Sequence, residues 1–140
     1  MDRRIRTIRF RSLIQTVNAG PQTVAELGVI GLGSTSRRFG CNLRQSGDAI
    51  ECAGCGYYTV TASAVVSPTA AGVVSIEMQQ NGSPVTGAIS SAAVATADNP
   101  VTLTIVSAIR LACEETGTLT FVLTEGEGTV ENISVRVEKA

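Results

Sequence analysis

Histidine and tryptophan are absent from this chain of 140 residues, and aromatic side chains make up only 4% of it. Without histidine the chain lacks the commonest general base and metal ligand, and it cannot build Ser/His/Asp or Cys/His catalytic arrangements. No stretch approaches the ~18 consecutive apolar residues of a membrane span, and no apolar segment of the kind found in a signal peptide follows the N-terminus. These absences predict a protein that is not an enzyme, has no cofactor or metal, avoids membranes and is made in a cytoplasm.

Helical periodicity is nearly missing, and a period of two takes its place. Leu119, Phe121 and Leu123 alternate with threonines, and Asn81-Gly82 is a strong hairpin turn between two such segments. Segments of this kind, joined by short turns, are typical of an antiparallel β-sandwich or jelly roll, here with about 8–10 strands. The pattern predicts an all-β domain over residues 21–140, with an irregular glycine-rich loop over residues 28–40.

Basic residues gather at the start of the chain. Five of the eleven cations are Arg3, Arg4, Arg6, Arg9 and Arg11, whereas most acids lie in the second half. Residues 1–20 are therefore predicted to form a basic arm or a first strand. Arginine suits fixed contacts with carboxylate or phosphate, so the arm is a candidate for binding an acidic protein surface. Nucleic acid is a weaker candidate, because Phe10 is the one aromatic side chain nearby that could stack on a base.

The four cysteines leave three interpretations open. A hairpin over residues 41–52, with its turn at Ser46-Gly47, brings Cys41 opposite Cys52 and makes them a candidate disulfide. Cys52 and Cys55 form a CxxC pair that could join Cys41 and Cys113 in a zinc site, although the last two are far apart in sequence. Four reduced, small hydrophobic side chains are the simplest interpretation for a protein of the cytoplasm.

The segment Gly56-Tyr57-Tyr58-Thr59-Val60 is similar to a strand of the trimeric jelly-roll modules of the tumour-necrosis-factor and complement globular-head type. From Cys41 to the C-terminus the chain resembles small virion proteins of tailed phages. The pieces that carry this second resemblance are Cys41-Asn42-Leu43-Arg44-Gln45, Ser67-Pro68-Thr69-Ala70-Ala71-Gly72, Asn81-Gly82-Ser83-Pro84-Val85-Thr86-Gly87-Ala88 and Val135-Arg136-Val137-Glu138-Lys139. The resemblance implies a homotrimer around a threefold axis, with Tyr58 and Phe121 at or near the packed inner sheet.

Together with the arm, the resemblance leads to two functional hypotheses. The first is a capsid decoration protein on the surface of a phage virion, held by its arm to the major capsid protein or another virion protein. A trimer fits threefold positions of a capsid without a symmetry mismatch. The second is a receptor-binding or adhesion knob of a tail or head fibre.

Overall fold

The computed structural model describes residues 11–139, so Arg3, Arg4, Arg6 and Arg9 lie outside the part that is described here. The described chain holds eleven strands and no helix, hence no helix able to cross a membrane. The strands are β1 (Ser12–Asn18), β2 (Gln22–Val24), β3 (Ser34–Phe39), β4 (Leu43–Ser46), β5 (Ala49–Ala53), β6 (Gly56–Pro68), β7 (Gly72–Gln80), β8 (Ser83–Val94), β9 (Val101–Leu111), β10 (Thr116–Glu125) and β11 (Gly128–Lys139).

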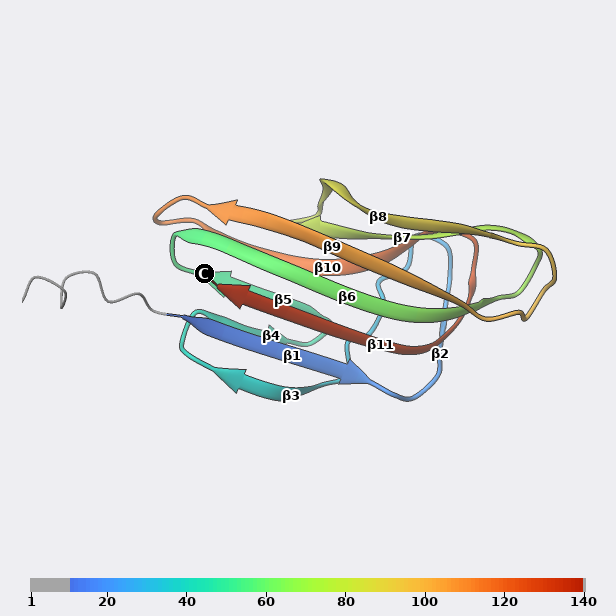
Figure 1. Cartoon of the computed structure of the whole chain (residues 1–140), viewed down its shortest axis with the longest axis horizontal. Helices are drawn as coiled ribbons and strands as arrows, with labels where there is room; N and C mark the ends of the chain where they lie inside the picture. The colour runs from blue at the N-terminus through green and yellow to red at the C-terminus, as the bar shows by residue number, and fades with distance from the viewer. Residues whose placement is uncertain (1–10, 140) are drawn as a thin grey trace, which may run out of the picture.

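The strands form two antiparallel sheets that pack face to face (Figure 1). The first sheet has the order β3-β1-β11-β6-β9, and β2 extends it by pairing with β11 beyond the end of β1. The second sheet has the order β4-β5-β10-β7-β8. Strands next to each other in a sheet are mostly distant in sequence, as in a jelly roll. The all-β sandwich expected from the sequence is confirmed.

Alternation along each strand explains why the sandwich forms. In β6 every second side chain, from Tyr58 to Val66, is buried, and those between them face outward. The same alternation places Phe121 on β10 and Val135 on β11 between the sheets. Burying such side chains contributes roughly 1.5–3 kcal/mol each, which makes this common interior the main source of stability.

The turns follow the local chemistry of the sequence. Asn81 and Gly82 both have positive φ, at 53° and 83°, as a two-residue type I′ hairpin turn requires. They join β7 to β8, and the Asn81 side chain also accepts a hydrogen bond from the Thr118 amide at 2.8 Å. The predicted hairpin turn is therefore confirmed.

The hairpin of β4 and β5 differs from its prediction in register. Its turn lies at Gly47-Asp48 instead of Ser46-Gly47, with φ of 60° at Gly47, because a glycine in the first central position favours a type II′ turn. Leu43 consequently faces Cys52, a shift of two residues that keeps the same side chains buried. Cys41 lies beyond the paired region and is exposed, whereas Cys52 is buried.

Two other segments are more ordered than the sequence indicated. The predicted loop over residues 28–40 contains β3, which pairs with β1, and its first part lies along β10 through the bridge between Val29 and Val122. Within the predicted arm or first strand, residues 12–18 form β1 inside the first sheet. The sequence does not predict β3 and the full extent of β1, because these segments are rich in glycine or arginine. They become strands only by pairing with segments that are distant in sequence.

A disulfide joins Cys55 and Cys113, and Cys41 and Cys52 are free. The candidate disulfide between Cys41 and Cys52 is thus wrong, and the four-cysteine zinc site loses two of its ligands. The physical reason is the pairing of β6 with β9: Gly56 faces Leu111, which brings the turns on either side together. The bond ties the β5–β6 turn to the β9–β10 turn at the end of the sandwich where β1 begins.

Breaking this bond should destabilise the domain markedly. It closes a loop with a sequence separation of 58 residues, for which the loss of chain entropy in the unfolded state predicts ~4 kcal/mol. We expect Cys55→Ser to lower the free energy of unfolding by up to that amount, measured by urea denaturation without reductant. Cys41→Ser should leave the stability unchanged, and dithiothreitol should affect the wild type but not Cys55→Ser. Equal stability of wild type and Cys55→Ser would contradict a structural role for the bond.

Candidate interaction surfaces

Tyr58 and Phe121, the predicted trimer-packing residues, lie in the interior of a single chain. Both side chains are 0% exposed, and the Tyr58 hydroxyl donates to the carbonyl oxygens of Ala53 at 2.9 Å and Gly54 at 2.7 Å. A side chain enclosed between the two sheets has no surface left for a partner. The prediction for these two residues is therefore wrong, because the inner parity of β6 and β10 serves the sandwich core.

The outer face of the first sheet is the broadest surface made of small side chains. Rows across β11, β6 and β9 place Ser134, Ser63 and Thr104 side by side, and next to them Arg136, Thr61 and Val106. We call the central outward side chains of β6 and β9 the threonine face, which consists of Thr59, Thr61, Ser63, Val65, Thr102, Thr104, Val106 and Ala108. Tyr57 and Arg110 continue the same face at one end. Val106 is 73% exposed near its centre. Short side chains leave the backbone accessible, so another flat sheet can approach closely.

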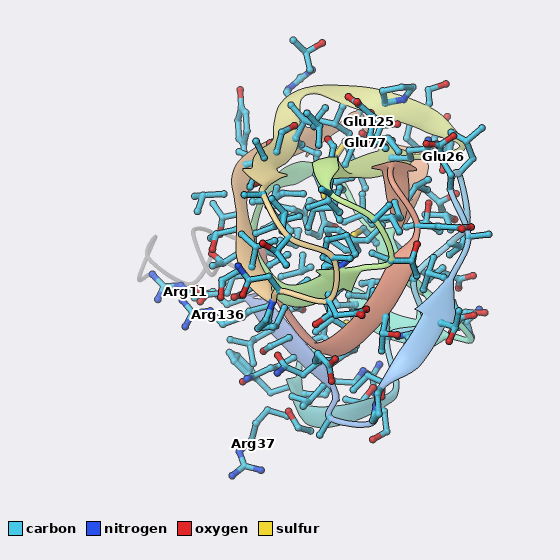
Figure 2. All side chains as sticks on the ribbon, turned by 90° about the vertical axis from the view of Figure 1, so that its right-hand side faces the viewer. Arg11, Glu26, Arg37, Glu77, Glu125 and Arg136 are labelled. Carbon is cyan, nitrogen blue, oxygen red and sulfur yellow. A yellow bond between two sulfur atoms is a disulfide. The ribbon has the colours of Figure 1, made fainter. Side chains whose placement is uncertain are left out.

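Basic side chains border this face towards β3. Arg37 lies on the row of Gln15 and Arg136, and Arg136 forms an ion pair with Glu138 on its own strand. Arg11 is exposed where the chain enters β1, and Figure 2 shows Arg11, Arg37 and Arg136 on the same side of the molecule. Arg11 is the one arginine of the predicted arm within the described chain. The structure brings it near a basic border that the sequence did not connect with the arm.

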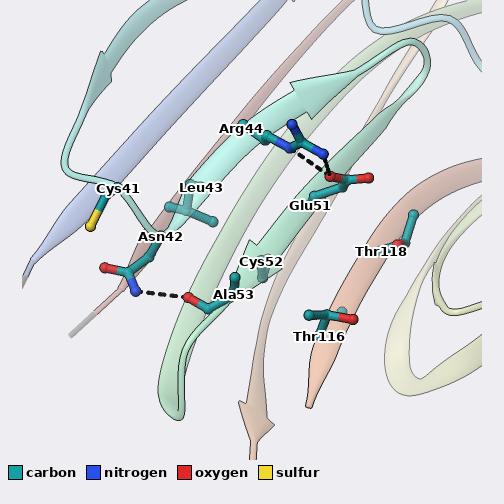
Figure 3. Close-up of a pocket in the computed structure, with 10 residues that line it drawn as sticks. Cys41, Asn42, Leu43, Arg44, Glu51, Cys52, Ala53, Thr116 and Thr118 are labelled. Atoms are coloured by element: carbon teal, nitrogen blue, oxygen red, sulfur yellow. Dashed lines mark hydrogen bonds and ion pairs between the residues drawn. The ribbon is translucent and has the colours of Figure 1, made fainter. Parts of the chain in front are cut away.

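A shallow depression of ≈ 350 Å³ lies on the opposite, outer face of β4, β5 and β10 (Figure 3). Arg44 and Glu51 face each other across it at 2.6 Å, and the Asn42 amide donates to the Ala53 carbonyl at 2.7 Å. Thr116 and Thr118 line its other side. The ion pair neutralises the only charges that line the depression, so it offers hydrogen bonds rather than an acid–base pair.

Within residues 11–139, no group of three cysteine or acidic side chains is placed to hold a metal ion. The acids Glu114, Glu115 and Glu127 lie in connections between strands, Glu125 ends β10, and all four are exposed. The Glu115 carboxylate accepts a hydrogen bond from the Ala112 amide at 2.6 Å, which is a turn-stabilising role.

Comparison with known proteins places the fold. No family model matches the chain, and no curated protein matches its sequence. Among solved structures, the Eiger TNF from S. frugiperda has a TM-score of 0.69 at 11% identity, covering 94% of this chain and 92% of that one. The globular domain of zebrafish complement 1qA has a TM-score of 0.66 at 7% identity, covering 90% and 94%. The vertex protein P5 of phage PRD1 has a TM-score of 0.64 at 14% identity, covering 94% and 99%.

These similarities confirm the jelly-roll fold of the tumour-necrosis-factor and complement-head type. Identities of 7–14% carry the fold and not the function. The similarity extends over nearly the whole length of both partners in each case, so this chain has the complete sandwich. Its structural neighbours include a TNF, the globular domain of a complement protein and a phage vertex protein.

The buried pair of Cys52 and Tyr58 makes stability sensitive to alkaline pH. Burial raises the pKa of the Cys52 thiol from 9.0 to about 12. Burial, with a smaller contribution from the charge of Cys52, raises the pKa of the Tyr58 phenol from 10.0 to about 12. In the unfolded chain both groups lose their protons at the ordinary values, so between pH 9 and 12 the unfolded state binds fewer protons than the folded state. Stability is therefore full below about pH 9 and falls as the pH rises towards 12.

We expect the urea midpoint to decrease from about pH 9 upward, and Cys52→Ala to remove the part of this decrease that begins near pH 9. Tyr58→Phe should remove the part that begins near pH 10. The variants are compared by the slope of the urea midpoint against pH and not by the midpoint itself, because both substitutions also remove packing or hydrogen bonds at every pH. Cys41→Ala, which changes an exposed thiol, is the control. The same slope in all four proteins would refute the assignment.

Proposed function

We propose that this protein is a capsid decoration protein of a phage virion, a homotrimer that attaches to the major capsid protein through its basic N-terminal arm. The observation that carries the proposal is the combination of a complete jelly roll, similar in fold to a phage vertex protein among others, with an arginine-rich arm at one end. The role is mechanical and needs no catalysis. It consists of clamping neighbouring capsid subunits together.

The threonine face supports self-association. It lies on the outer side of the first sheet, and it holds Val106 exposed among hydroxyl and methyl groups. Burying its small side chains removes apolar surface from water, and the neighbouring Arg136 already has an ion pair with Glu138. Val106 and its neighbour Thr61 therefore replace Tyr58 and Phe121 as the residues we assign to trimer packing.

The arm supports attachment. Arginine forms bidentate hydrogen bonds with carboxylates, and an extended segment can add backbone hydrogen bonds to the edge of a partner sheet. A trimer carries three arms, and linked contacts strengthen binding by roughly 10²- to 10⁴-fold over a single one. The disulfide between Cys55 and Cys113 suits a particle that leaves the host, because such bonds persist in oxidising surroundings.

The trimer can be tested with two matched substitutions on opposite faces. Val106→Arg, on the threonine face, should fold normally but sediment as a monomer of 14.5 kDa, because it introduces a charge into the interface. Ile89→Arg changes an exposed residue on the other sheet (53% against 73% exposed) and should remain trimeric. Analytical ultracentrifugation measures both. A monomeric wild type, or a trimeric Val106→Arg, would overturn the assignment.

Attachment can be tested with the full-length chain and capsids that lack this protein. Replacing Arg3, Arg4, Arg6 and Arg9 with glutamine should reduce binding by at least ~10-fold, because charge-assisted contacts are lost from every arm. Arg44→Gln, which removes a cation from the body of the domain, is the control. Co-sedimentation gives the affinity, and electron microscopy should show density at threefold or quasi-threefold positions. Binding to host cell walls with no affinity for capsids would instead support the receptor-binding knob.

A further inference from the structure

Exposed apolar side chains gather on the outer face of the second sheet. We call them the apolar patch, which consists of Leu27 (71% exposed), Val29 (49%), Val73 (47%) and Ile89 (53%). One row crosses the sheet from Val29 through Val122 and Glu77 to Ile89, because each of these residues pairs with the next. Exposed apolar side chains that share one face with the Glu77 carboxylate favour a partner that carries both apolar and basic groups. The patch lies on the face opposite the threonine face, so a trimer packed through the latter leaves it open.

The charges around the patch are of one sign. Glu77 and Glu125 point outward from the same face, and the Glu26 carboxylate accepts a hydrogen bond from the Gly126 amide at 3.1 Å. Figure 2 shows these three glutamates together, away from Arg11, Arg37 and Arg136. Arg44 is the one cation on this face within residues 11–139, and its ion pair with Glu51 already compensates it.

A hollow of ≈ 420 Å³ adjoins the patch at the end of the sandwich away from the start of β1. Val73 belongs to both the hollow and the patch, and Glu26, Glu125 and Glu127 line the hollow with the loop over residues 69–72. The surface thus combines apolar side chains for contact area with carboxylates around a recess. Its complement is an extended segment that carries both apolar side chains and cations.

The chain itself contains such a segment. Residues 1–10 hold four arginines and one aspartate, a net charge of +3, and because the whole chain is −1 the remaining residues contribute −4. Ile5, Ile8 and Phe10 are interspersed with the arginines. The segment precedes Arg11, at the end of the sandwich opposite the hollow, and ten extended residues span at most ~33–36 Å. That length is sufficient to reach across the contact between two neighbouring molecules.

We propose that the apolar patch of one copy binds residues 1–10 of a second copy, with isoleucine and phenylalanine side chains on the patch and arginines on Glu77, Glu125 and the hollow. This contact goes beyond attachment to a capsid and does not depend on it. A single arm binds either the capsid or the apolar patch of another copy at one time, and a trimer has three arms. Neighbouring trimers can therefore be linked laterally while other arms remain available.

The test is a charge exchange in the full-length protein, without capsids. Wild type should form species larger than the trimer as its concentration rises at low salt, measured by sedimentation velocity. Glu77→Arg with Glu125→Arg should weaken this association at least ~10-fold, and so should Arg6→Glu with Arg9→Glu, because each pairs like charges. Combining all four substitutions should restore the association, since it recreates opposite charges in reversed positions.

Two controls separate this contact from general charge effects and from the trimer. Glu114→Arg changes the net charge in the same direction at the β9–β10 turn, the end of the sandwich away from the hollow, and should leave the association unchanged. Ile89→Asp should weaken it, whereas Ile89→Val should preserve it. At low protein concentration, where the larger species dissociate, every variant should sediment as a trimer. Association that is unaffected by the patch substitutions, that is not restored by the combination, or that does not depend on concentration would overturn the proposal, whatever the outcome with capsids.

Discussion

Strand β6 is the constraint on which the rest of the molecule depends. It pairs along almost its entire length with β11 on one side and β9 on the other, and its inward side chains reach the centre of the core. Because a slip of one residue would exchange its buried and exposed faces, this pairing fixes the register of the first sheet. It also fixes which residues form the threonine face and where Cys55 meets Cys113.

The alternation that predicts β6 could be recognised in the sequence, and so could most of the core. Val74, Ile76 and Met78 on β7 are buried as their spacing indicated. Side-chain periodicity reports which face is buried but not which strand lies next to which. Cys55 and Cys113 are partners only through the pairing of β6 with β9. The candidate pair Cys41 and Cys52 is wrong because the turn lies one residue later, with Gly47 in its first central position, which shifts the register by two.

The candidate surfaces were harder to predict for the same reason. The resemblance to trimeric jelly-roll modules pointed to Tyr58 and Phe121, yet large apolar side chains at inward positions pack into the core of the single chain. Residues that make contacts between subunits must come from the outward-facing positions of the strands. Thr61 and Val106 occupy such positions, but nothing in the sequence distinguishes them from other strand residues. The apolar patch likewise joins Val29, from a predicted loop, to Ile89 across strands that are neighbours only in space.

Separation of charge links the two faces to the arm. The basic residues near β1 and the carboxylates around the hollow lie on different sides of one sandwich. Because of this distance, these cations and carboxylates cannot form ion pairs with each other within one molecule. Opposite charges held apart on one body favour contacts between bodies. The sandwich thus keeps Arg11, Arg37 and Arg136 away from its own acidic face and exposes both groups of charges to other molecules. This division of charge between two sides of one domain is the property that the proposed contact between copies requires.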